Sequence, residues 1–179
     1  MSNATSGAQR MNYVEARSHI KTGDLIALRT THGGFPALVR WFTKSPYTHT
    51  AVALWMCDRL MMIETRIVAG IVPMSQLGDT DFDVIRCPVA DPEYVFIEAF
   101  NILGTPINYD FIDLLRIAAR LKLGWKAPDA DDGRKVCSAL SAAVYRLAGW
   151  NPAGLPGIPA PCEVVAAAGP VAIEVRNGG

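Results

Sequence analysis

Cys137 is the residue of this sequence best placed for covalent chemistry. It opens an Ala/Leu-rich stretch that predicts a helix, and a loop containing Arg134 and Lys135 leads directly into it. A thiol at a helix N-terminus beside cations has a lowered pKa, because the helix dipole and the positive charges stabilise the thiolate. Free cysteines are also often small buried packing residues, and that interpretation stays open here. The other cysteines lack this context and are expected to fill space in the core: Cys57, Cys87 and Cys162.

A cysteine nucleophile needs a base within hydrogen-bonding reach, and the chain contains three histidines. His49 lies in the Thr-, Ala- and Val-rich run 48–54, which predicts a strand that would hold the ring in place. His19 and His32 lie in predicted turns or loops, where we expect them at the surface. His49 is therefore the candidate base, with a half-buried ring without a catalytic role as the alternative.

Glu64 is the candidate for the group that fixes the tautomer of the imidazole and stabilises its charged form. A hairpin closed by Asp58 and Arg59 would pair Ala53 with Glu64, so that Glu64 and His49 share one face of the sheet. The two residues would then be four positions apart along the strand, about 13 Å. Contact between them requires a bulge or a longer loop that shifts the pairing; otherwise Glu64 is a charged residue at a sheet edge.

Tyr109 is the candidate for substrate binding, because it follows the breaker segment 104–106 and could place its phenol in a cleft. A tyrosine just before a helix is also often a packing residue with a solvated tip. The acidic loop around Asp129, Asp131 and Asp132 lacks the residue order of a calcium loop, and no C-x-x-C pair is present. We expect no metal site and no cofactor.

Length and composition set the class of protein. The 179 residues fit one domain, and a chain that is 50% hydrophobic and 19% charged is globular, not disordered. The equal numbers of basic and acidic residues, 17 each, argue against nucleic acid as a partner. No apolar stretch approaches the ~20 residues of a transmembrane segment. No secretory signal is visible, so we expect a cytoplasmic protein by default, with delivery to the cell wall and the oligomeric state left open.

The predicted elements place strands mainly in the first half of the chain and helices mainly in the second, which favours an α+β fold. We expect strands at 25–28, 48–56, 60–66, 70–73, 82–87 and 171–175, and helices at 13–19, after Pro36, and at 92–103, 110–123 and 137–148. The helix after Pro36 is expected to be buried, because it is apolar on much of its surface. In the helix 110–123, Leu115 belongs to the predicted apolar stripe. Residues 1–19 are expected to form a flexible N-terminal segment before one domain at 20–179.

Five short motifs occur in a recognisable order: Gly23-Asp24-Leu25-Ile26, Tyr47-Thr48-His49-Thr50-Ala51-Val52, Ile63-Glu64-Thr65, Gly104-Thr105-Pro106-Ile107-Asn108-Tyr109-Asp110-Phe111 and Val136-Cys137-Ser138-Ala139-Leu140. Over about residues 20–165 this order resembles the permuted papain-like amidases, the YaeF/YiiX group of circularly permuted NlpC-type cysteine hydrolases. Papain-like and ordinary NlpC-type enzymes place the cysteine before the histidine, whereas here His49 precedes Cys137.

The resemblance implies a circularly permuted papain-like (NlpC-type) fold, in which an antiparallel sheet packs against helices and the cysteine stands at a helix start. It implies a Cys/His/acid triad formed by Cys137, His49 and Glu64, with Tyr109 as an active-site wall or oxyanion neighbour. The family commonly has an acidic residue two positions after the cysteine, where this chain has Ala139.

The expected function is a cysteine hydrolase, an amidase or peptidase, acting on small peptides or amides such as the cell-wall peptides of peptidoglycan fragments. A second interpretation is a lipid acyl hydrolase or acyltransferase of the related permuted group. A third is a binding or assembly module that keeps the fold without turnover.

Overall fold

The computed structural model describes residues 7–30, 34–65, 68–89, 91–103, 111–124 and 136–177. One mixed sheet runs through this part of the chain in the order β1-β7-β6-β2-β3-β4-β5. Its strands are β1 (Gln9–Met11), β2 (Leu25–Leu28), β3 (His49–Met56), β4 (Arg59–Thr65), β5 (Ala69–Pro73), β6 (Phe82–Ile85) and β7 (Val171–Val175). The helices are α1 (Tyr13–Ala16), α2 (Gly34–Thr43), α3 (Pro92–Leu103), α4 (Phe111–Leu123), α5 (Cys137–Leu147) and α6 (Pro161–Ala168), with two 3₁₀ turns, η1 (Arg17–His19) and η2 (Met74–Leu77).

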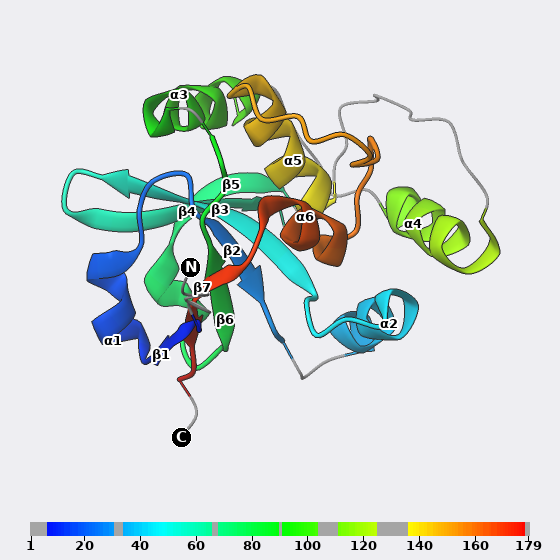
Figure 1. Cartoon of the computed structure of the whole chain (residues 1–179), viewed down its shortest axis with the longest axis horizontal. Coiled ribbons are helices and arrows are strands. Elements are labelled where there is room, and N and C mark those ends of the chain that lie inside the picture. The colour runs from blue at the N-terminus through cyan, green and yellow to red at the C-terminus, as the bar shows by residue number, and fades with distance from the viewer. Residues whose placement is uncertain are drawn as a thin grey trace, which may run out of the picture.

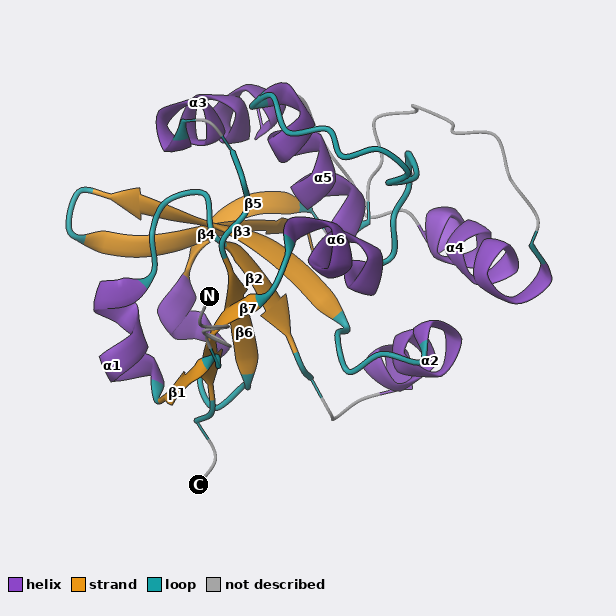
Figure 2. Cartoon of the chain, in the orientation of Figure 1, coloured by secondary structure: helices purple, strands orange, loops and turns teal. Residues whose placement is uncertain are grey.

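The α+β arrangement is confirmed, with most of the expected strands and helices within a few residues of their predicted ends (Figures 1 and 2). The expectation of a purely antiparallel sheet is wrong at one edge, because β1 pairs with β7 in parallel. Regular structure also begins earlier than the expected helix at 13–19, because β1 precedes it. β1 forms that edge of the sheet. Asn12 and Glu15 then cap α1 reciprocally, each side chain accepting a hydrogen bond from the other's backbone N–H at 3.1 Å or less. A three-residue strand is too short to show a hydrophobic alternation in the sequence.

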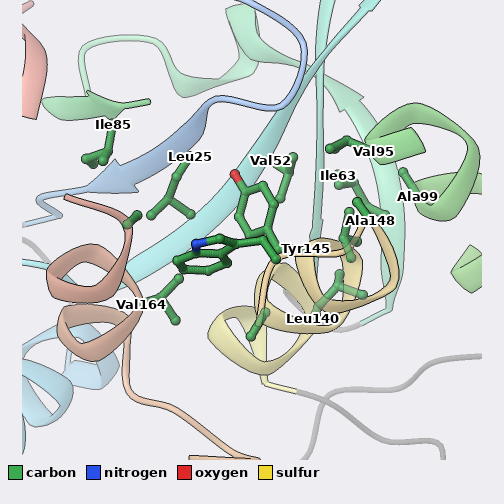
Figure 3. Packing of buried hydrophobic residues seen from close by; sticks show 14 of the residues in the cluster. Leu25, Val52, Ile63, Ile85, Val95, Ala99, Leu140, Tyr145, Ala148 and Val164 are labelled. Atoms are coloured by element: carbon green, nitrogen blue, oxygen red, sulfur yellow. The ribbon is translucent and has the colours of Figure 1, made fainter. Parts of the chain in front are cut away.

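The sheet carries an apolar core on each face. On one face, α3, α5 and α6 pack against the central strands, and Tyr145 and Leu140 of α5 lie among Leu25, Val52 and Ile63 (Figure 3). The Tyr145 hydroxyl, which is fully buried, donates to the backbone carbonyl of Gly23 at 3.0 Å. The other face is covered by the N-terminal segment with α1 and by η2. Because both faces of β6 are buried, polar and apolar residues alternate only weakly along its sequence.

Helices α2 and α4 lie together at one end of the molecule and are less buried than predicted (Figure 1). Val39 of α2 is buried, but Trp41 is 64% exposed, so the expectation of a buried helix is wrong. Leu115 of α4, a member of the predicted apolar stripe, is 63% exposed, whereas Ile117 and Ala118 are buried. Each of these helices therefore buries one side only and leaves apolar residues on the outside. In the described ranges, no helix has both the length and the apolar character that a membrane crossing requires.

Candidate active site

The first residue of α5 and the first residue of β3 come together to form the candidate active site. Helix α5 packs directly on β3 and β4, which brings Cys137 to His49. The thiol and the imidazole ring are close enough for each to shift the pKa of the other. Both are withdrawn from solvent: Cys137 is 5% exposed and the His49 side chain 15%. The two residues that the sequence selected as nucleophile and base thus lie in contact.

Glu64 completes the expected trio, because its Oε2 lies 2.8 Å from Nε2 of His49. The turn between β3 and β4 is formed by Cys57 and Asp58, since Met56 pairs with Arg59. The predicted turn at Asp58-Arg59 is therefore wrong by one residue. Continuing the observed register would place Glu64 opposite Ala51, two positions from His49 instead of four, which is the distance of a diagonal pair within reach of long side chains.

A positive φ explains why this turn is hard to predict. Two-residue hairpin loops favour turns with φ above zero, where Asn and Gly are the usual residues. Cys57 takes that position with a φ of 56°, and its side chain is exposed. The expectation that Cys57 packs in the core is wrong, whereas Cys87 and Cys162 are partly buried and pack against core residues.

The electrostatics of the trio favour a thiolate–imidazolium pair. Burial would lower the pKa of His49, but the charge and hydrogen bond of the Cys137 thiolate, together with those of Glu64, raise it to about 10. Burial would raise the pKa of Cys137, but His49 and the backbone N–H groups of Thr50 and Ser138 lower it below the usual range. The pKa shifts of the two groups therefore point the same way, toward a proton held on the imidazole and a charge on the sulfur.

Hydrogen bonds behind the sulfur fix the start of α5 against β3. The Thr50 and Ser141 hydroxyls lie 3.1 Å apart, and Ser141 also donates to the carbonyl of Cys137 at 3.2 Å. The Ser138 hydroxyl donates to the carbonyl of Pro159 at 2.7 Å. The sequence analysis missed these residues. Ser141 could have been found from its spacing, because a residue four positions after Cys137 lies on the same side of the helix.

A buried ion cluster holds the chain just before β3. The Asp83 carboxylate, which is inaccessible to solvent, accepts hydrogen bonds from the Tyr47 hydroxyl at 2.6 Å and from Nε of Arg29 at 3.0 Å. Nη2 of Arg176 in turn donates to the other carboxylate oxygen at 2.9 Å. Burial, together with the hydrogen bond and charge of Asp83, raises the pKa of Tyr47 to about 12. This cluster fixes the residue two positions before His49.

A narrow pocket opens beside the sulfur. Its walls come from α2, α4 and the starts of α5 and α6: Val39, Phe42, Thr43, Thr48, Ile117, Ala118, Val136, Cys137, Ser138 and Pro161. Most of these side chains are apolar. The free volume is about 10 Å³, roughly the space that one water molecule needs.

The remaining candidates divide into surface residues and residues outside the described ranges. His19 is exposed, as expected. Tyr109, His32 and the basic and acidic loop residues Arg134, Lys135, Asp129, Asp131 and Asp132 lie outside the described residues. Among the residues that the structure describes, no group of three or more His, Cys, Asp or Glu side chains could hold a metal ion.

Neither the scan against protein-family models nor the search of curated proteins finds a match to this chain. The arrangement of Cys137, His49 and Glu64 is therefore the main indication of its function. Ala139 stands where the resembled family commonly has an acidic residue. It is 5% exposed and packs with Ile117 and Val136, so a carboxylate here would be buried and would need a partner.

Proposed function

We propose that the chain is a cysteine hydrolase that cleaves amide bonds, with Cys137 as nucleophile, His49 as acid and base and Glu64 as the residue that orients the ring. The observation that carries the proposal is the shared imidazole. Its Nε2 is engaged by Glu64 at 2.8 Å, which leaves Nδ1 for the thiol at the start of α5. A nucleophile, a base and a group that orients the base are the parts that this chemistry requires.

The reaction follows from these positions. The Cys137 thiolate attacks the substrate carbonyl, a C–S bond forms, and the carbonyl electron pair moves to oxygen. The backbone N–H groups of Thr50 and Ser138, which help to lower the pKa of Cys137, are the donors that we assign to that developing charge. The protonated His49 then gives its proton to the leaving amine as the C–N bond breaks, which leaves a thioester. His49 next takes a proton from water, and the hydroxide releases the acid and restores the thiolate.

We propose small peptides or amides, including cell-wall peptides, as substrates, and the circularly permuted papain-like arrangement as the fold. Two observations support the fold: the histidine stands on a strand that precedes the cysteine in the chain, and the cysteine begins a helix packed on that strand. The pocket leaves no room for a bulky group beside the sulfur, which supports a small substrate.

Hydrolysis or transfer of a lipid acyl group is the second candidate, and the apolar walls of the pocket are the observation that favours it. The two candidates differ in the bond cleaved and in acyl length. A matched set of amides and esters with the same short or long acyl group separates them. An amidase turns over the short amides, whereas the lipid enzyme turns over only the long esters.

Alkylation by iodoacetamide at about pH 6 tests the nucleophile, because only a thiol of lowered pKa is then substantially ionised. We expect Cys137 to be modified first, as located by mass spectrometry, and Cys137→Ala to lose both this fast phase and amide turnover. Cys57→Ser is the matched control, because Cys57 is the exposed cysteine among the described residues. Turnover that survives in Cys137→Ala would refute the proposal.

A further inference from the structure

An exposed patch with both apolar and basic character covers the outer sides of α2 and α4, and we call it the α2–α4 surface. Its apolar members are Leu38, Trp41 and Leu115, which are 41%, 64% and 63% exposed. Its basic members are Arg40, Lys44 and Lys122. The two helices contact each other, and Nζ of Lys122 lies 4.8 Å from the centre of the Trp41 ring. Leu115 and Lys122 are two turns apart on α4 and share one side of it. The apolar and basic groups therefore belong to one surface.

An open groove of about 550 Å³ lies on the α2 part of this surface. It is lined by Ala37, Arg40, Trp41, Lys44, Ser45 and Pro46. The lining thus combines two cations and an indole ring without a carboxylate. This combination suits an anionic head group beside an apolar layer, because Trp accumulates at such interfaces and basic residues attract the charge.

The charge of this region differs from that of the whole chain. The chain is neutral, yet the segment 34–48 contains two basic residues and no acidic one, and 111–124 contains three basic residues and one acidic one. In the described part of the chain, no ion pair involves Arg40, Lys44 or Lys122. These three cations are therefore available to an external anionic surface.

Helix α3 provides a comparison within the same molecule. Its exposed apolar residues Tyr94, Ile97 and Phe100 are as accessible as those of α2, but the charged residues of this helix are Glu93 and Glu98. Exposed apolar groups alone therefore do not distinguish the α2–α4 surface. The two surfaces differ in the sign of the neighbouring charge, which is positive at α2 and α4 and negative at α3. A positive surface favours an anionic partner.

We propose that the α2–α4 surface docks the protein on an anionic phospholipid bilayer, with Trp41, Leu38 and Leu115 in the interface and the three cations at the head groups. The inner sides of the same helices form part of the pocket beside Cys137, through Val39 and Ile117, so docking brings that pocket close to the bilayer. Docking does not require the hydrolase reaction, and the Cys137→Ala variant should bind equally well.

Co-sedimentation with vesicles tests this surface. We compare phosphatidylglycerol/phosphatidylcholine vesicles with pure phosphatidylcholine vesicles, at low and high salt. We expect binding to the anionic vesicles only, and weaker binding at high salt. Arg40→Gln with Lys44→Gln should lower the partition coefficient by about 5-fold per charge removed, and Trp41→Ala by roughly tenfold. Tyr94→Ala, which removes an equally exposed ring from the acidic α3, should leave binding unchanged.

Three outcomes would overturn the proposal: no binding to the anionic vesicles, equal binding to neutral ones, or binding that the Arg40/Lys44 and Trp41 variants leave intact. Circular dichroism confirms that each variant is folded. Because Cys137→Ala is measured in parallel, failure of docking and failure of the hydrolase proposal give different results.

Discussion

Replacing Glu64 by Gln should weaken catalysis and shift the ionisation of the active-site pair. The carboxylate is 5% exposed, and its oxygen lies 2.8 Å from Nε2 of His49. A hydrogen bond to a charged group contributes about 1.5–3 kcal/mol. Since about 1.4 kcal/mol is a factor of ten in rate, kcat/KM on an amide substrate should fall about 10- to 150-fold.

The same change should be visible in the titration. The pKa of His49, about 10 in the native chain, should fall by roughly one to two in Glu64→Gln. The pKa of Cys137 should rise, because a less stable imidazolium stabilises the thiolate less. The rate of iodoacetamide alkylation against pH reports the thiol directly, and the acidic limb of this profile should move to higher pH.

The control is Asp24→Asn, which neutralises another buried carboxylate, one paired with Arg86. It should change stability but leave the acidic limb of the alkylation profile in place. The role assigned to Glu64 would be refuted if Glu64→Gln kept the native kcat/KM, or if both variants moved the alkylation profile equally.

Two further predictions concern the framework. Cys57→Gly should stabilise the protein by about 0.5–1 kcal/mol, because the strain of a non-glycine residue at a φ of 56° costs more than the chain entropy that glycine loses on folding. A lower midpoint in thermal unfolding would contradict the strained turn. Asp83→Asn should cost about 3 kcal/mol in urea unfolding, since it leaves Arg29 and Arg176 without their shared buried carboxylate, and a loss below about 1 kcal/mol would show that the cluster contributes little.

Local sequence signals predicted the elements well where they were strong. The apolar run of β2 and the Pro-to-Gly limits of α3 gave the observed or nearly observed ends. The Thr- and Val-rich run around His49 and the Ala/Leu-rich run after Cys137 identified the strand and the helix that carry the site. Residue type, helix position and strand parity indicated Cys137, His49 and Glu64 as candidates, each with an alternative left open, and the resemblance joined them into one triad.

The contact between His49 and Glu64 could not be predicted, because it depends on one residue in the register of the hairpin. Asp58-Arg59 is a reasonable polar turn, and only the positive φ of Cys57 places the turn one position earlier. The sequence pattern also could not predict that α2 is exposed on one side. An apolar helix is buried only where other elements cover it, and α4 covers α2 on one side alone, which leaves Trp41 outside.

The most direct test of the thiolate–imidazolium pair is the pH titration of thiolate ultraviolet absorbance, measured as the difference between the native chain and Cys137→Ala. We predict that Cys137 ionises below the ordinary thiol pKa of about 8.5, and that its partner His49 stays protonated up to about pH 10. A Cys137 that titrates at or above the ordinary thiol value would contradict the pair and, with it, the proposed nucleophile.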